Sequence, residues 1–166
     1  MKKRLLSAAL ALALAVACLA GCGAASEEKT VAKALGLEKL PAVTHISSYD
    51  SHGGFLGDGV SCIALTFEDD QLEQQLAADP AWNSLPADET VQALVWGVED
   101  GTVSTGPCLT DSDGQPLVPP VEKGCYRLID RHSDQQGDIL SRGSFNFTVG
   151  VYDAEARVLY CCELDT

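Results

Sequence analysis

Four side chains that could bind a metal or move a proton lie in two short polar stretches. Asp50 and His52 follow one β-rich segment, and Asp130 and His132 follow another. Imidazole and carboxylate groups are common ligands of divalent metal ions. If both stretches lie at one edge of a sheet, these four residues are candidates for a shared binding site.

A hydrolytic site is the second chemical alternative. Ser133 lies beside His132 and Asp134, and a serine with a histidine and an aspartate can form a nucleophilic set. The sequence contains no HExxH, GxSxG or Walker-type motif. The same residues are also suited to capping turns and forming an ion pair at strand ends. The sequence therefore assigns no catalytic residue, no metal ligand and no cofactor.

The first 22 residues have the layout of an export signal. Lys2, Lys3 and Arg4 precede an apolar run over residues 5–20. This run is shorter than the roughly 20 apolar residues of a membrane-spanning helix, and a charged start before a short apolar run is typical of a signal peptide. The run ends in Leu-Ala-Gly-Cys, residues 19–22.

This ending resembles the lipobox of bacterial lipoproteins. In that family the cysteine thiol receives a diacylglyceryl group, and the signal is cleaved directly before the cysteine. The resemblance implies that Leu19, Ala20 and Gly21 are recognition residues and that Cys22 is lipidated. Two acyl chains anchor a protein stably, whereas one chain does so only marginally. We therefore expect residues 1–21 to be a signal peptide and the mature chain to be anchored at the extracytoplasmic face of the cell membrane.

The remaining chain has the size of one domain. Removal of residues 1–21 leaves 145 residues, enough to bury a core without the help of disulfides. We expect a tether over residues 22–42, with or without a short helix, and a single domain over residues 43–166. The signal holds three of the 11 basic residues and none of the 24 acidic ones, so the mature charge is −16. Such a charge disfavours nucleic acid as a partner.

Five cysteines follow Cys22, and their pattern leaves their state open. Cys62, Cys108, Cys125, Cys161 and Cys162 lack the paired spacing of a zinc site. Cys161 and Cys162 are adjacent, so on a strand they point to opposite faces. Both disulfides, which exported proteins can form, and free, partly buried thiols are compatible with this pattern.

The alternation of apolar residues predicts an α+β fold. Two strands over 43–49 and 60–67 form a hairpin. A helix begins at residues 68–70, where Asp69 or Asp70 can cap it and Asp70 and Glu73 have the spacing of a capping box. A second helix is capped by Asp88. Residues 99–120 are irregular. Three strands over 124–130, 145–152 and 157–164 complete the chain. We expect a two-layer sandwich, with a mainly antiparallel sheet and both helices on the face of Phe147 and Val149.

The segments YDSHGGFLGDG, YRLIDRHS and SFNFTVGVYDAEARVLYCCELDT resemble blocks of a group of small uncharacterised exported proteins of Gram-positive bacteria. The group has no assigned activity, so the resemblance implies no catalytic role. We expect a membrane-anchored binding or accessory module that contacts a ligand or another membrane or cell-surface protein. The alternative is a small metal-dependent or hydrolytic enzyme that uses His52 and His132.

Overall fold

The computed structural model describes residues 26–53 and 57–166. The lipobox and Cys22 lie outside these residues. Within the described ranges, no helix combines the length and the hydrophobicity of a membrane span.

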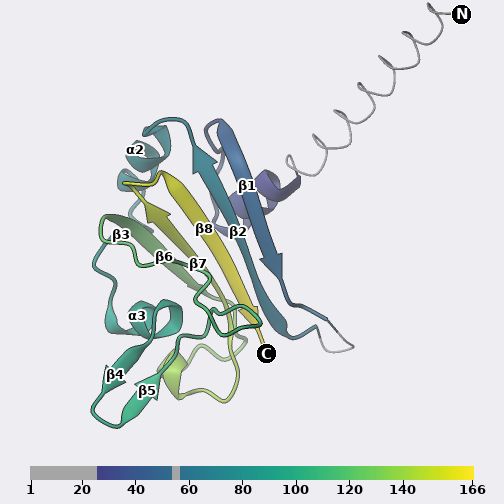
Figure 1. Cartoon of the computed structure of the whole chain (residues 1–166), viewed down its shortest axis with the longest axis vertical. Helices are drawn as coiled ribbons and strands as arrows, with labels where there is room; N and C mark the ends of the chain where they lie inside the picture. The colour runs from purple at the N-terminus through teal and green to yellow at the C-terminus, as the bar shows by residue number, and fades with distance from the viewer. Residues whose placement is uncertain (1–25, 54–56) are drawn as a thin grey trace, which may run out of the picture.

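One six-stranded antiparallel sheet carries the fold, with the strand order β1-β2-β8-β7-β6-β3 (Figure 1). A separate hairpin is formed by β4 and β5. The strands are β1 (Val43–Asp50), β2 (Gly59–Phe67), β3 (Asn83–Ser84), β4 (Val98–Asp100), β5 (Val103–Thr105), β6 (Gly124–Asp130), β7 (Asn146–Asp153) and β8 (Val158–Asp165).

The helices are α2 (Gln71–Ala77), α3 (Glu89–Val95) and the 3-10 helix η1 (Ile139–Ser141). They are short, with α2 and α3 between β2 and β6 in the sequence and the 3-10 helix between β6 and β7. Before β1, residues 26–34 are helical, so the short helix that the sequence left open is present. The predicted α+β fold is confirmed, with a mainly antiparallel sheet and with α2 and α3 between an N-terminal hairpin and the C-terminal strands.

The sheet is covered on both faces, which corrects the expectation that α2 and α3 share one face. Phe147, Val149 and Val151 of β7 pack with α3, and we call this side the α3 face. Tyr152 packs with α2 and with the helix over residues 26–34, and we call this side the α2 face. Because neighbouring residues of a strand point to opposite faces, β7 supplies both cores.

Two local expectations are also corrected. Asp70 is the N-cap of α2 but makes no side-chain cap hydrogen bond. The capping box is therefore absent, and it is the other predicted candidate, Asp69, whose side chain accepts a hydrogen bond from the backbone N–H of Gln71 at 3.0 Å. The segment 99–120 is not wholly irregular, because it contains part of the β4–β5 hairpin. By contrast, the predicted cap of α3 is confirmed, since Asp88 accepts a hydrogen bond from Val91 N–H at 2.9 Å.

Candidate functional site

The predicted polar residues lie at one edge of the sheet, as the sequence led us to expect. In the antiparallel order, β1, β8 and β6 all end at this edge, which places Asp50, Asp165 and Asp130 along it. Four strand spacings separate β1 from β6, about 19 Å at the usual spacing between neighbouring strands. The two predicted groups therefore share an edge but lie on separate strands of it.

The ring of His52 is held between two carboxylates. Its Nδ1 lies 2.7 Å from Asp50 Oδ1, and its Nε2 lies 3.4 Å from Asp165 Oδ2. Asp50 also accepts the backbone N–H of His52 at 2.9 Å. These hydrogen bonds, the backbone one first, stabilise the carboxylate and lower the pKa of Asp50. A Cβ atom at Gly59 would lie 2.6 Å from His52 Cα, so only glycine fits beside this histidine.

Asp165 contacts His52 and also Arg131, the residue between Asp130 and His132, and sequence reasoning missed it. Besides His52, its carboxylate accepts from Arg131, whose Nη2 lies 3.0 Å from Oδ1. Asp165 directly follows the strand predicted over residues 157–164, with no chemical motif around it. Only the pairing of β2 with β8 brings it beside the β1–β2 loop.

Asp130 and His132 form a second, separate set of contacts. Asp130 accepts from Arg142 Nη1 at 2.7 Å and from the backbone N–H of His132 at 3.0 Å. Partial burial opposes ionisation of Asp130, but the hydrogen bonds from Arg142 and His132 outweigh it, and its pKa is lowered. The Nε2 of His132 lies 3.1 Å from Ser144 Oγ, so the hydroxyl beside this ring belongs to Ser144 and not to Ser133.

These contacts do not assemble a metal site within the part of the chain that the structure describes. No group of three or more His, Cys, Asp and Glu side chains in these residues is arranged to hold a metal ion. Each imidazole instead contacts groups from its own neighbourhood, Asp50 and Asp165 for His52, and Ser144 for His132. The polar side chains at this edge therefore form internal hydrogen bonds and ion pairs with one another.

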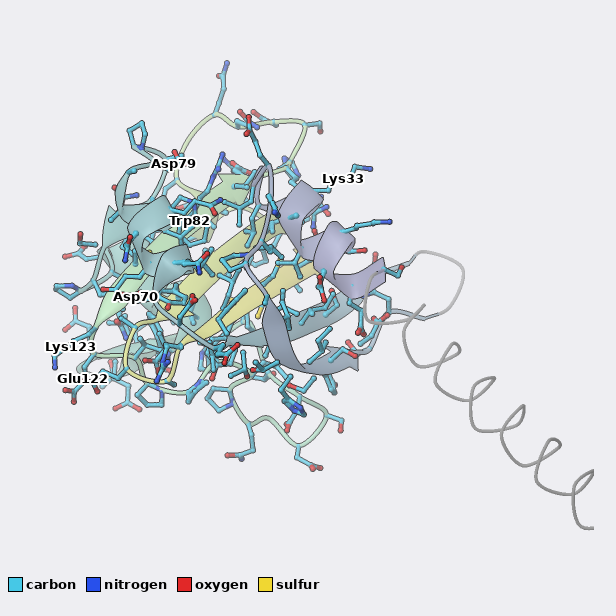
Figure 2. The ribbon with its side chains drawn as sticks, turned by 90° about the horizontal axis from the view of Figure 1, so that it is seen from above. Lys33, Asp70, Asp79, Trp82, Glu122 and Lys123 are labelled. Atoms are coloured by element: carbon cyan, nitrogen blue, oxygen red, sulfur yellow. The ribbon has the colours of Figure 1, made fainter. Side chains whose placement is uncertain are left out.

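A hollow on the α2 face has a different character. It has a volume of about 280 Å³ and lies where α2, β3, β6 and β7 meet. The lining comprises Glu73, Leu76, Ala77, Trp82, Ser84, Lys123, Gly124, Cys125, Tyr152 and Ala154. In Figure 2, Trp82 lies beside α2, and Lys123 lies at the outer margin of the molecule. This volume lies just below the range of small-molecule sites, roughly 300–1,000 Å³, so it suits only a small group.

Two aromatic side chains of this hollow carry buried polar atoms without a partner. Trp82 is 7% exposed and Tyr152 is 0% exposed. Neither Trp82 Nε1 nor the Tyr152 hydroxyl makes a hydrogen bond to a described residue. An unpaired buried donor is destabilising by about 1–3 kcal/mol, so such atoms are uncommon in folded proteins. No sequence motif marks Trp82 or Tyr152 as part of a site.

The electrostatics of the hollow disfavour an anion. Burial, with an added contribution from the carboxylate of Glu73, raises the pKa of Tyr152 to about 12 and that of Cys125 to about 12. The ammonium group of Lys123 is paired with Glu155 at 2.6 Å. The residues around the hollow thus include two side chains with neutral, buried donors, Trp82 and Tyr152, and one carboxylate, Glu73.

Comparison with protein-family models, with curated proteins and with solved structures finds no match. The function is therefore argued from the sequence and from this geometry.

Proposed function

We propose that this chain is a membrane-anchored extracytoplasmic lipoprotein whose folded domain is a binding module. The anchor is the diacylglyceryl group expected on Cys22, and residues 1–21 are the signal that is removed. The observation that carries the binding role is the hollow lined by Trp82 and Tyr152, whose buried donors have no partner among the described residues and would be reached by a ligand after a small shift of these side chains. The enzyme alternative has less support, because His52 and His132 engage in separate internal contacts.

The donors in the hollow define the chemistry of the ligand. The indole N–H of Trp82 only donates, so its partner must be an acceptor. An amide group would satisfy the site at two points, with its carbonyl oxygen accepting from Trp82 or Tyr152 and its N–H donating to Glu73. A small neutral molecule or group that bears an amide is the ligand we propose.

The two tryptophans of the chain make this proposal measurable. The indole N–H of Trp96 already donates to the carbonyl of Pro119 at 3.0 Å, so Trp96 is an internal control. The full mature chain, purified in mild detergent, is titrated with N-methylacetamide and, separately, with acetate. We expect N-methylacetamide to shift the indole N–H resonance of Trp82 in an NMR spectrum and to leave that of Trp96 in place, and we expect acetate to shift neither.

Equal shifts of both resonances, or none at saturating amide, would show that the hollow does not bind this group. The Trp96→Phe variant assigns the two signals. The Tyr152→Phe variant removes one donor with little change of shape, and it should weaken binding of the amide several-fold.

The anchor is tested by metabolic labelling with an alkyne-bearing fatty acid. We expect the label on the wild-type chain in the membrane fraction, and we expect Cys22→Ser to lose both the label and the membrane association. Cys18→Ser is the matched control, because Cys18 lies inside the expected signal. A mature chain with an unmodified Cys22 thiol would contradict the anchor and leave the ligand proposal intact.

A further inference from the structure

Two buried cysteines face each other on adjacent strands of the sheet. In the pairing of β2 with β8, Cys62 lies directly opposite Cys162. Both side chains belong to the core of the α3 face, where Cys62 is 5% exposed and Cys162 is 0% exposed. All five cysteines of the described residues are free thiols in this structure.

The hydrogen-bond pattern shows which type of cross-strand pair this is. Ser51 donates its backbone N–H to the carbonyl of Val60, so the peptide groups of Val60, and of Cys62 two residues later, point toward β1. Phe67 belongs to the alternate set and donates to Arg157, next to β8. Cys62 and Cys162 are therefore a non-hydrogen-bonded pair, in which the side chains approach most closely.

This geometry suits a disulfide. The Cα atoms of a non-hydrogen-bonded antiparallel pair lie about 4.5 Å apart, within the range of about 4.4–6.8 Å seen across disulfides. Among the cysteines that the structure describes, no other is placed as well. Cys161 points to the opposite face and lies across from Ile63, and Cys125 is on β6, two strands from β8.

We propose that Cys62 and Cys162 are a disulfide-forming pair that joins β2 to β8. In the reaction a disulfide of an oxidant, such as glutathione disulfide, is attacked by one thiolate, and a mixed disulfide and one oxidant thiol form. The second cysteine then attacks the mixed disulfide and releases the other oxidant thiol. Two protein thiols are oxidised, one oxidant disulfide is reduced, and the two protons end on the released thiols.

The bond would connect two hairpins that are far apart in the sequence. The chain between the two cysteines contains α2, α3 and β6, so the closed loop is long and the entropy lost by the unfolded chain is large. Burial raises the pKa of the Cys162 thiol, so little thiolate is present in the folded domain at neutral pH. Oxidation of the folded domain should therefore be slow and should accelerate when the sheet opens.

The test equilibrates the full chain, in detergent, with glutathione disulfide at neutral pH, after brief unfolding in urea and refolding. Free thiols are blocked with N-ethylmaleimide, and the digest is mapped by mass spectrometry without reduction. We expect a single cross-linked pair of peptides that contains Cys62 and Cys162. The oxidised chain should melt on the order of 10 °C above the reduced chain. This experiment needs neither the lipid anchor nor the amide ligand, so its outcome is independent of the proposed function.

Cys161→Ser is the matched control, because it changes the adjacent residue on the opposite face and should keep the cross-link. Cys62→Val should abolish the cross-link and the difference in melting temperature. Because a variant in this core can fail to fold, the mapping of the wild-type chain decides the outcome. Maleimide on both Cys62 and Cys162 after oxidation, or a cross-link that contains Cys161, would overturn the proposal.

Discussion

The edge of the sheet and the hollow on the α2 face differ in how far their polar groups are paired. At the edge, Asp50, His52 and Asp130 each lie within hydrogen-bonding distance of a neighbour, and the exception is Arg142 Nε, which is buried without a partner among the described residues although the same guanidinium pairs with Asp130. Around the hollow, the N–H of Trp82 and the hydroxyl of Tyr152 are buried without a partner in residues 26–53 and 57–166. The residues that are most conspicuous in the sequence therefore support the structure, whereas two aromatic residues with no motif around them leave hydrogen-bonding capacity unused.

The difference shows how a site can be found without a motif. Charged residues at strand ends are easily satisfied by loops and by water, so their chemistry is a weak indicator of function. A buried donor without a partner lowers stability, and such groups in a native structure call for an explanation. We attribute the unpaired donors of the hollow to a ligand and the paired groups of the edge to folding.

The largest loss of stability is expected from a substitution at the edge of the sheet that carries Asp50, Asp130 and Asp165. Asp130→Ala removes the partner of Arg142, whose side chain is only 12% exposed. An ion pair broken this far from solvent leaves a poorly solvated guanidinium, and we expect a loss of about 2–3 kcal/mol in the free energy of unfolding. Urea denaturation measures it. Glu155→Ala is the control and should change little, because Glu155 and Lys123 are 61% and 71% exposed. If Asp130→Ala and Glu155→Ala lower the free energy of unfolding equally, the ion pair of Asp130 with Arg142 does not stabilise the fold more than an exposed pair does.

A smaller difference in stability is expected between the phenylalanine variants of two buried tyrosines, Tyr126 and Tyr152. The hydroxyl of Tyr126 donates to Asp88 Oδ2 at 3.0 Å, whereas that of Tyr152 has no partner in the described chain. We expect Tyr126→Phe to lower the free energy of unfolding by about 1 kcal/mol. Tyr152→Phe should leave the ligand-free domain unchanged or slightly more stable. If both variants lose the same stability in urea denaturation, the Tyr152 hydroxyl has a partner and the contrast with the edge disappears.

The smallest expected effect is on how the free energy of unfolding depends on pH in the acid range. The pKa of Asp130 lies below its ordinary value of 3.8 in the folded state, so the unfolded chain takes up the proton first as the pH falls. The contribution of Asp130 to stability is therefore complete above about pH 5 and is lost as the pH falls through 3.8 and then through the lower folded pKa. Urea midpoints between pH 6 and pH 3 should fall less steeply for Asp130→Asn than for the wild-type chain. Arg142→Met should flatten the profile in the same way, and an unchanged profile in both variants would show that the ion pair does not shift this titration.

The local elements of the fold were largely predictable. The period-two alternation around Val149 and the β-branched residues after Gly59 predicted β7 and β2 within one residue of their observed bounds. The cap at Asp88 was predicted because capping is a contact between residues three positions apart. The face of the sheet that each helix covers was not predictable, since α2 has an apolar stripe that fits either side.

The sequence by itself determined the order of the elements and the identity of the polar residues at the strand ends, because hydrophobic periodicity and turn chemistry are local. It also supports the expected export signal and lipid anchor, which are read from a short motif. The tertiary structure decided that Asp165 lies beside His52, that Cys62 faces Cys162, and that Trp82 and Tyr152 share a hollow. These relations depend on strand order and register, which are set by the packing of segments far apart in the chain.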